Sequence, residues 1–413
     1  MEAVIAKPIV ISNRNQNLVL TAALLGWFFD GFEMGLFPII ARPSLASLLG
    51  HANDSHIGPW IAQITALFLI GAALGGFLFG WLGDRIGRVR SLSLSVLTYS
   101  VFTGLCYFAT EPWHLGALRF VGALGMGGEW ALGVALVMET WPAEKRALVA
   151  GLIGAASNLG YFAVAACGSL MHVTVDSWRH FVILGALPGL LTFFIRLYVP
   201  ESERWQACTP SRNPLHDIFA LGYAKSVGMG VALCTVFLLG TWGAVSWAPT
   251  WVDQLTHGTR PEAKVFVQMA YAFGATIGSF AAAMFCAMWR PRAVYGVLCV
   301  LSLASCLTLY FCVPEFGALF LFVMLLIGLT SGSFYGWAAY YLPALFPTKI
   351  RATAQGIAFN MGRAFAAIGV LGTGSFVQFF GGNYAHAGAV TCLIYGVGFV
   401  FIWFAPEKQE ELF

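Results

Sequence analysis

Five ionisable side chains lie inside stretches of the chain that are otherwise apolar. They are Asp30, Glu33, Arg119, Glu129 and Arg363. At the centre of a membrane-spanning helix such a group costs roughly 2.5–3.5 kcal/mol, so it is usually retained for a function or held in an ion pair. These five residues are therefore the first candidates for chemistry.

Asp30 and Glu33 are three residues apart, so on a helix they share one face. Two ionised carboxylates this close repel each other, and the repulsion favours proton uptake by one of them. Arg363 keeps its charge and offers a planar fork that matches a carboxylate. We predict a site where Asp30, Glu33 or Glu129 takes a proton and Arg363, with Arg119, holds an organic anion. The alternative is a structural ion pair of either arginine with one of these carboxylates.

Polar and aromatic residues from the same stretches could line such a site. Trp and Tyr are also common as packing and interface residues, so none of them identifies a site alone. Beside the two arginines we take four residues as candidates for substrate binding: Tyr335, Trp337, Gln355 and Asn360.

The composition predicts which elements position these residues. Charged residues are 10 % of the chain and hydrophobic residues 59 %, with a mean hydropathy of +0.77. A soluble domain has about 25 % charged residues, so the chain is predicted to lie in a membrane. The net charge of +3 gives no basic face for nucleic acid. The nine cysteines show no metal-ligand spacing, and no nucleophile–base set or phosphate loop appears, so we predict no enzyme.

A membrane-spanning helix needs about 20 mostly apolar residues. Lipid leaves backbone groups no partner outside a helix or a closed barrel, so an all-α fold is expected. We predict twelve spans, near residues 18–41, 58–83, 91–110, 113–139, 147–171, 180–200, 226–250, 264–288, 293–313, 316–344, 352–380 and 384–405.

The basic residues predict the orientation. With the N-terminus in the cytoplasm, sixteen of the 22 Lys and Arg residues fall on the cytoplasmic side and four on the outer side. Because cytoplasmic loops carry the excess of Lys and Arg, both termini are expected on the cytoplasmic side. The membrane would be a cell membrane, inner or plasma.

The longest polar interruption, 201–225, divides the chain into two sets of six spans. The loops at 141–151 and 346–356 share one pattern at the same spacing: Trp or Phe, Pro, Arg-Ala and Gly. Such a repeat is typical of alternating-access transporters. We predict a six-helix bundle at 1–200, a cytoplasmic linker at 201–225 and a second bundle at 226–413.

A short loop between the second and third spans carries a fixed pattern of residues: Gly80, Asp84, Arg85, Gly87 and Arg88. It resembles the signature loop of the major facilitator superfamily. Val89 departs from the pattern, because a basic residue is common there. The corresponding segment of the second half, 285–292, has lost the Asp and the Gly.

The chemistry of this loop predicts a conformational latch. Glycines permit close helix approach, and Asp84 can accept from a neighbouring helix N-terminus, where a carboxylate is favoured. The arginines can pair with Glu139 at the end of the fourth span. We include Arg146 and Arg351, from the repeated loops, among the gating residues. The alternative is that these charges serve topology alone.

Three further segments resemble narrower groups within that superfamily. Residues 119–146 are similar to the fourth span of the sialate and lactate proton symporters. Residues 30–33 resemble the Asp-Gly-aromatic-Asp motif of acid:proton symporters, with Glu in the last place, and 200–205 resembles the end of the first half in sugar porters.

The resemblance implies proton-coupled symport of a small organic anion, a monocarboxylate or an acidic sugar. It implies no cofactor besides the proton as coupling ion, and a protein that functions as a monomer in the lipid bilayer. Two alternatives remain open: a neutral sugar or metabolite uniporter or exporter of the same fold, and a membrane receptor that does not transport.

Overall fold

The computed structural model describes residues 13–50, 54–171, 173–208, 213–256, 260, 262–381 and 383–406. Every regular element in these residues is helical, as the composition predicts. Ten helices or helical runs of the described chain are long and apolar enough to cross a membrane. Large apolar side chains such as Phe108 and Leu170 stay exposed, as is expected of a protein whose surface a bilayer covers.

The described residues of the first half form the helices α1 (Asn13–Leu49), α2 (Asp54–Ile86), α3 (Arg88–Leu105), α4 (Pro112–Thr140), α5 (Arg146–Met171), α6 (Trp178–Ile183) and α7 (Pro188–Tyr198). Two short helices follow, α8 (Glu203–Ala207) and α9 (Pro214–Ala220). In the second half, the part of the chain that the structure describes forms α10 (Ala224–Leu239), α11 (Ala248–Leu255), α12 (Glu262–Met288), α13 (Pro291–Cys312), α14 (Ala318–Ser331), α15 (Ser333–Tyr341), α16 (Arg351–Phe379), α17 (Tyr384–Cys392) and α18 (Ile394–Phe401).

Some pairs of consecutive helices form one longer rod with a short interruption. A three-residue 3-10 turn joins α6 to α7, and Gly332 alone separates α14 from α15. Between α10 and α11 the chain makes a π-turn over Gly240–Ala244. There the ring of Tyr395 would come within 2.3 Å of a Cβ on Gly240, so only glycine fits. The rod α6–α7, which the 3-10 turn interrupts, is not among the ten long apolar helices.

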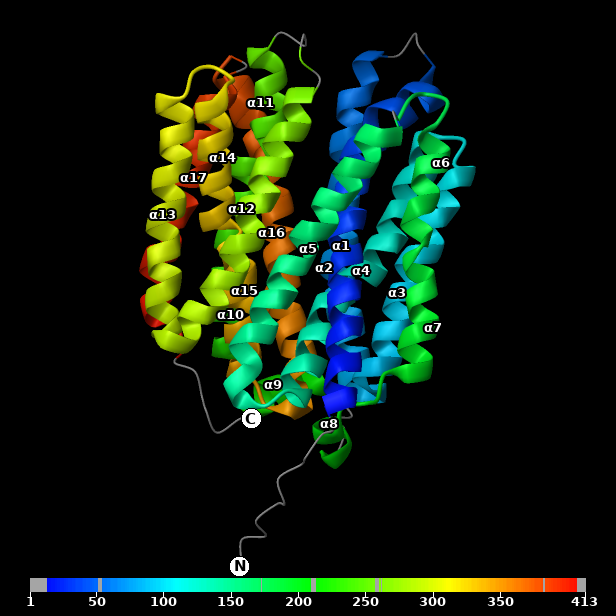
Figure 1. The fold of residues 1–413 in the computed structure, drawn as a ribbon, viewed down its shortest axis with the longest axis vertical. Helices are drawn as coiled ribbons and strands as arrows, with labels where there is room; N and C mark the ends of the chain where they lie inside the picture. Colours follow the sequence, from blue (N-terminus) through cyan, green and yellow to red (C-terminus); the bar gives the residue numbers. More distant parts are fainter. Residues whose placement is uncertain are drawn as a thin grey trace, which may run out of the picture.

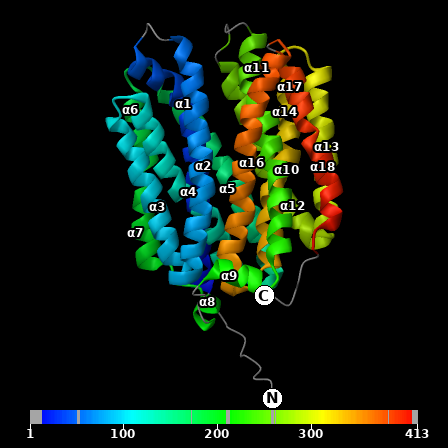
Figure 2. The same cartoon turned by 180° about the vertical axis from the view of Figure 1, so that it is seen from behind.

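The two halves stand side by side, with α1–α7 in one group and α10–α18 in the other (Figures 1 and 2). They meet where α2 packs on α16 and where α5 packs on α12 and α15. Gly154 and Gly336 touch so closely that a Cβ on Gly154 would lie 2.7 Å from the Cα of Gly336. Helix α16, 29 residues long, lies against α2 and α4 of the other half.

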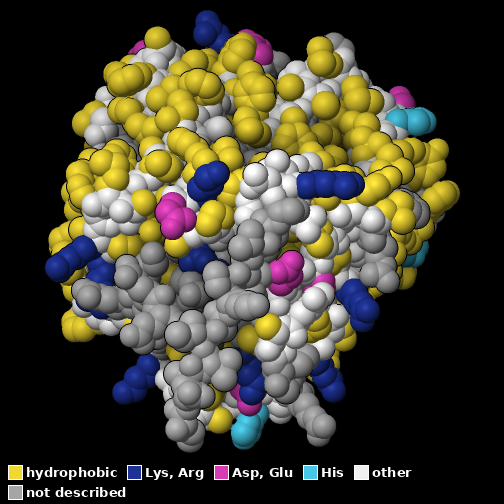
Figure 3. Space-filling model, turned by 60° about the horizontal axis from the view of Figure 1, so that its bottom comes forward, with side chains coloured by type: hydrophobic (Ala, Val, Ile, Leu, Met, Phe, Trp, Pro, Cys, Tyr) yellow, Lys and Arg dark blue, Asp and Glu magenta, His cyan; other side chains and the backbone are white. Residues whose placement is uncertain are grey.

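The end of the molecule that carries α8 and α9 is called the linker end below. Helix α1 begins there and the last helical turn, Ile402–Phe404, ends there (Figure 1). Seen from the linker end, basic side chains stand around a surface whose flanks are apolar (Figure 3). The sequence predicted this face to be cytoplasmic.

Candidate functional site

At the linker end, Asp84 of α2 binds the first turn of α16. Its Oδ2 accepts from the backbone N–H (2.8 Å) and the hydroxyl (2.6 Å) of Thr353, and its Oδ1 accepts from the N–H of Ala352 (3.3 Å). The same Oδ1 lies 2.9 Å from Nη1 of Arg88. A carboxylate at a helix N-terminus accepts hydrogen bonds from the free N–H groups, and its negative charge interacts favourably with the helix dipole. The acceptor predicted from sequence thus joins the first half to the second.

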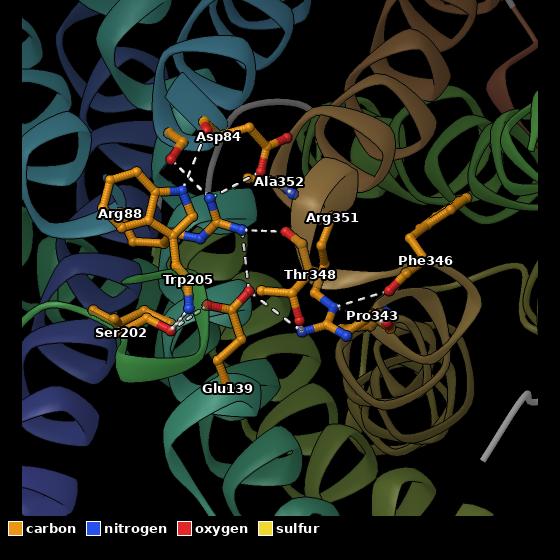
Figure 4. A network of polar contacts seen from close by, with 12 residues as sticks. Asp84, Arg88, Glu139, Ser202, Trp205, Pro343, Phe346, Thr348, Arg351 and Ala352 are labelled. Atoms are coloured by element: carbon orange, nitrogen blue, oxygen red, sulfur yellow. Dashed lines mark hydrogen bonds and ion pairs between the residues drawn. The ribbon is translucent and has the colours of Figure 1, made fainter. Parts of the chain in front are cut away.

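Glu139, at the end of α4, is the second carboxylate of this network. Its Oε1 lies 3.1 Å from Nη2 of Arg88 and 3.3 Å from Nη1 of Arg351. Arg88 also donates to the carbonyl of Thr348 (2.7 Å). Figure 4 shows these groups converging from both halves, all without exposure to solvent at the charged side chains. We call Asp84, Arg88, Glu139 and Arg351 the latch network.

The other residues of the signature loop have separate places. Gly80 lies against α16, where an added Cβ would come 2.7 Å from the carbonyl oxygen of Ala352. Gly87 has a φ of +111°, which favours glycine. Arg85 is exposed and lies 4.8 Å over the ring of Trp81, outside the latch network. Arg146 is buried, with Arg351 among the charges that act on it.

Sequence reasoning gave Glu201 no role, yet it caps α3. Its Oε1 accepts from the N–H of Arg88 (3.0 Å) and its Oε2 from the N–H of Val89 (3.1 Å). Ser202 donates to Oε2 of Glu139 (2.5 Å), and the indole of Trp205 donates to the carbonyl of Asp84. Burial raises the pKa of Glu201, while these amide donors and Arg88 lower it. The sequence pointed to this residue only through the resemblance of segment 200–205 to the end of the first half in sugar porters. That resemblance identified no group that Glu201 would bind.

Among the charges at membrane depth, Glu33 and Arg119 form a tight pair. Arg119 Nη1 lies 2.6 Å from Oε1 of Glu33, which also accepts from Thr103 (2.9 Å). The guanidinium lies over the rings of Phe37 and Phe68, at 5.1 and 4.6 Å. The geometry is that of the structural ion pair left open by the sequence, and it ties α1 to α3 and α4.

We expect Arg119→Met to lower the melting temperature of the purified protein in detergent. The substitution leaves the Glu33 carboxylate buried without its cation, which typically costs about 3–5 kcal/mol. In the double variant Glu33→Gln, Arg119→Met no charge remains, so we expect much of the loss to be recovered. An Arg119→Met protein that melts like the wild type would show that the pair contributes nothing to stability.

Asp30 and Arg363 form a looser pair that spans the two halves. Arg363 Nη2 of α16 lies 3.7 Å from Oδ2 of Asp30 on α1. Neither carboxylate oxygen of Asp30 has a hydrogen-bond partner among the described residues. Arg363 also donates to Oδ1 of Asn360 (3.3 Å), and its guanidinium lies 4.9 Å over the ring of Phe359. Both charges are buried, so the pair leaves hydrogen-bonding capacity unused at the centre of the molecule.

Glu129 of α4 lies close to the same pair. Its carboxylate fills the place where Gly26 of α1 would carry a side chain, one turn before Asp30: an added Cβ would lie 2.1 Å from Oε1. Neither of its oxygens has a hydrogen bond of normal geometry in the described chain. Asp30 and the hydroxyl of Tyr99 are the polar groups that act on it. Glu129 is thus buried without a cation as close partner, unlike Glu33.

The four predicted lining residues divide into two groups. Asn360 donates to the carbonyl of Gly127 (3.0 Å) and Gln355 to that of Ala131, so both fasten α16 to the backbone of α4. Trp337 donates to the carbonyl of Pro291 (2.8 Å) and packs against the rings of Tyr295 and Tyr341, so these contacts lie outside the group around Arg363.

Tyr335, in contrast, belongs to a group of rings beside Arg363. We call this group the aromatic clamp: Trp27, Trp130, Phe237, Tyr335 and Phe359. Trp130 stacks on Phe359 with ring centroids 4.1 Å apart and planes inclined by 17°. Trp27 and Tyr335 flank Phe359 at 6.3 and 6.4 Å, and Phe237 lies at 6.2 Å.

Apart from Tyr335, sequence reasoning missed the clamp. A signal was present, because its members accompany the buried charges along the chain. Trp130 follows Glu129 directly, Trp27 precedes Asp30 by three residues, and Phe359 precedes Arg363 by one helical turn. Within the described residues no group of three His, Cys, Asp or Glu side chains could hold a metal ion.

Comparisons with known proteins agree with this architecture. The family model of the Major Facilitator Superfamily matches residues 22–263. The cis,cis-muconate transport protein of Acinetobacter baylyi is 26 % identical, over 97 % of both chains. The "Probable 4-methylmuconolactone transporter" of Cupriavidus pinatubonensis is also 26 % identical, over 95 % of this chain and 91 % of its own.

Among solved structures, the proton:xylose symporter XylE bound to 6-bromo-6-deoxy-D-glucose superposes with a TM-score of 0.78. It covers 95 % of this chain and 96 % of its own at 18 % identity, which shows a shared fold. The family model covers more than half of the chain. The chain therefore belongs to the Major Facilitator Superfamily, as a multi-pass membrane protein of a transporter family and not an enzyme.

Proposed function

We propose that the protein is a proton-coupled symporter of a small organic anion that works by alternating access. The observation that carries the proposal is the Asp30–Arg363 pair, which joins the two halves at a buried position and leaves the carboxylate without a hydrogen bond from any described residue. An organic anion can replace Asp30 at Arg363 once Asp30 takes a proton. The names of the relatives, transporters of muconate and 4-methylmuconolactone, support an organic acid.

In this proposal Asp30 is the main proton carrier. Glu33 is held by Arg119 and Thr103, so protonating it would disrupt a hydrogen-bonded pair. Among the described residues Asp30 has one long ion pair to lose, at 3.7 Å. Glu129 is the second candidate, because neither of its oxygens has a hydrogen-bond partner in the described part of the chain. Arg363 holds the substrate carboxylate, and Arg119 supports the site from behind Glu33.

The architecture we propose has twelve spans in two six-helix bundles, 1–200 and 226–413, joined by a cytoplasmic linker at 201–225. Two spans beyond the ten apolar helices are supplied by the interrupted rod α6–α7 and by α16, whose length suffices despite its two arginines. The basic linker end then faces the cytoplasm of a cell with this protein in its inner or plasma membrane. We propose that one chain is the functional unit.

The latch network would hold the cytoplasmic side closed in this conformation. Asp84 and Arg88 come from the first half, Arg351 and the N-terminus of α16 from the second. Opening toward the cytoplasm would have to separate them. Gly80 permits the close approach to α16, and Gly87 permits the approach of Glu201. Arg351 is among the charges that act on Arg146, and Arg85 lies over Trp81, outside the latch network.

Uptake by proteoliposomes tests the proposal. Binding acids are first selected by thermal shift from monocarboxylates, dicarboxylates and acidic sugars. We expect a labelled binder to accumulate above its equilibrium level when the inside is made alkaline, and a protonophore to abolish the accumulation. Protein-free liposomes control for passive entry of the neutral acid. Uptake that only equilibrates, whatever the pH gradient, would instead identify a uniporter.

A further inference from the structure

The aromatic clamp is a contact between the two halves that separation of the halves must break. Trp130 belongs to α4 in the first half and Phe359 to α16 in the second, and their rings are stacked at 4.1 Å. Offset stacked rings contribute binding beyond the area that they bury. Without a ligand between them, the rings of Trp130 and Phe359 stack on each other and hold the two halves together.

The clamp also holds polar groups that have no partner. The indole N–H groups of Trp27 and Trp130 are buried, with side chains 2 % and 1 % exposed, and neither finds an acceptor in the described chain. A buried indole N–H usually has an acceptor, because leaving a donor unsatisfied is unfavourable. These two donors indicate a ligand that carries acceptor oxygens.

Arg363 fixes where such oxygens would lie. It stands one helical turn after Phe359 on α16, and its guanidinium lies 4.9 Å over that ring. A carboxylate held by Arg363 would thus leave the body of the ligand directed along the face of Phe359, toward Trp130. In this structure the two faces are in contact, so the body of a ligand can lie between them only once the two halves have moved apart.

Building on the proposed function, we infer that the substrate is a planar, conjugated carboxylate that inserts between Trp130 and Phe359. A flat π-system replaces one ring–ring contact by two, so inserting it sacrifices no stacking. An acidic sugar would instead place hydroxyl groups against apolar ring faces, where they lack partners. A saturated ring would keep the apolar contact and lose the stacking.

The test compares benzoate with cyclohexanecarboxylate, which share one ring and one carboxylate and differ in planarity. Calorimetric titration of the purified protein at one fixed pH gives both affinities. We expect benzoate to bind about tenfold more tightly, since two stacking contacts contribute together on the order of one decade in affinity. In Phe359→Leu this preference should fall close to one while cyclohexanecarboxylate affinity changes less than threefold.

Two further variants make the result specific. Phe322→Leu, an exposed position on α14, is the matched control and should keep the preference. Trp130→Leu removes the opposite wall and should lose the preference as Phe359→Leu does, which covers the case in which either protein fails to fold. Equal binding of both acids by the wild type, or a preference that survives in both clamp variants, would overturn the inference.

These outcomes are separable from failure of the proposed function. If saturated acids or acidic sugars bind as well as benzoate and accumulate with protons, organic anion symport stands and the planar substrate is wrong. If no acid of any shape accumulates in response to a pH gradient, the proposed function itself falls, and the inference falls with it.

Discussion

Replacing Asp84 with Asn should slow transport at least tenfold while leaving membrane insertion intact. The substitution removes the charge that pairs with Arg88 and caps α16 at Ala352 and Thr353. Removing one partner of a buried pair typically costs about 3–5 kcal/mol. That cost destabilises only the conformation that is closed on the cytoplasmic side. A difference of about 1.4 kcal/mol already shifts a two-state population tenfold.

The shift can be measured apart from the rate. In the Asn variant, a cysteine introduced at Thr353 should become more reactive to a thiol reagent added from the cytoplasmic side, in a background without the nine native cysteines. Glu203→Gln is the matched control, because this carboxylate lies exposed on α8 of the same end. Normal transport with unchanged reactivity would mean that the latch charges serve topology only.

Changing the central pair should separate binding from coupling. We expect Arg363→Lys to weaken anion binding at least tenfold, because Lys keeps the charge but lacks the planar fork. We expect Asp30→Asn to abolish accumulation driven by a pH gradient while exchange of internal for external substrate continues. The neutral Asn no longer competes with the anion for Arg363, and it takes no proton.

The measurement is substrate affinity against pH for both variants, together with uptake and exchange in proteoliposomes. Arg260→Lys and Asp176→Asn, at exposed positions, are the matched controls. If Arg363→Lys binds an anionic substrate as well as the wild type does, the carboxylate assignment fails. If Asp30→Asn and Glu33→Gln both still accumulate substrate, coupling lies elsewhere and Glu129 is the next candidate.

Much of the fold could be predicted from the sequence because bilayer thickness dictates helix length. Predicted spans such as 113–139 and 293–313 differ from α4 and α13 by only one or two residues. The largest difference is at α1, which continues to Leu49 through Pro38 and Pro43, where hydropathy predicted an end at 41. Hydropathy detects apolar length, but packing against the neighbouring helices decides where a helix stops.

The site was harder to predict, because its contacts join points far apart in the chain. Sequence indicated that Asp84 would meet a helix N-terminus, but only the packing of α2 on α16 identifies Thr353 as its partner. The pairing of Glu33 with Arg119, and of Asp30 with Arg363, was one of several combinations that the residue types allowed. At the π-turn, the space beside Gly240 is filled by the ring of Tyr395, which lies 155 positions later in the numbering.

The cap on α3 has a consequence for how the protein is made. Glu201 and the N–H of Arg88 are 113 residues apart, and Asp84 and Thr353 are 269 apart. At roughly 5–20 residues per second of synthesis, α3 waits about 6–23 s for its cap, and Asp84 waits about 13–54 s for α16. The first half can thus form its own contacts, including the cap on α3, while the second half is still being synthesised. Of these two contacts, the one that forms later in biosynthesis is the one that the proposed cycle must break in every turnover.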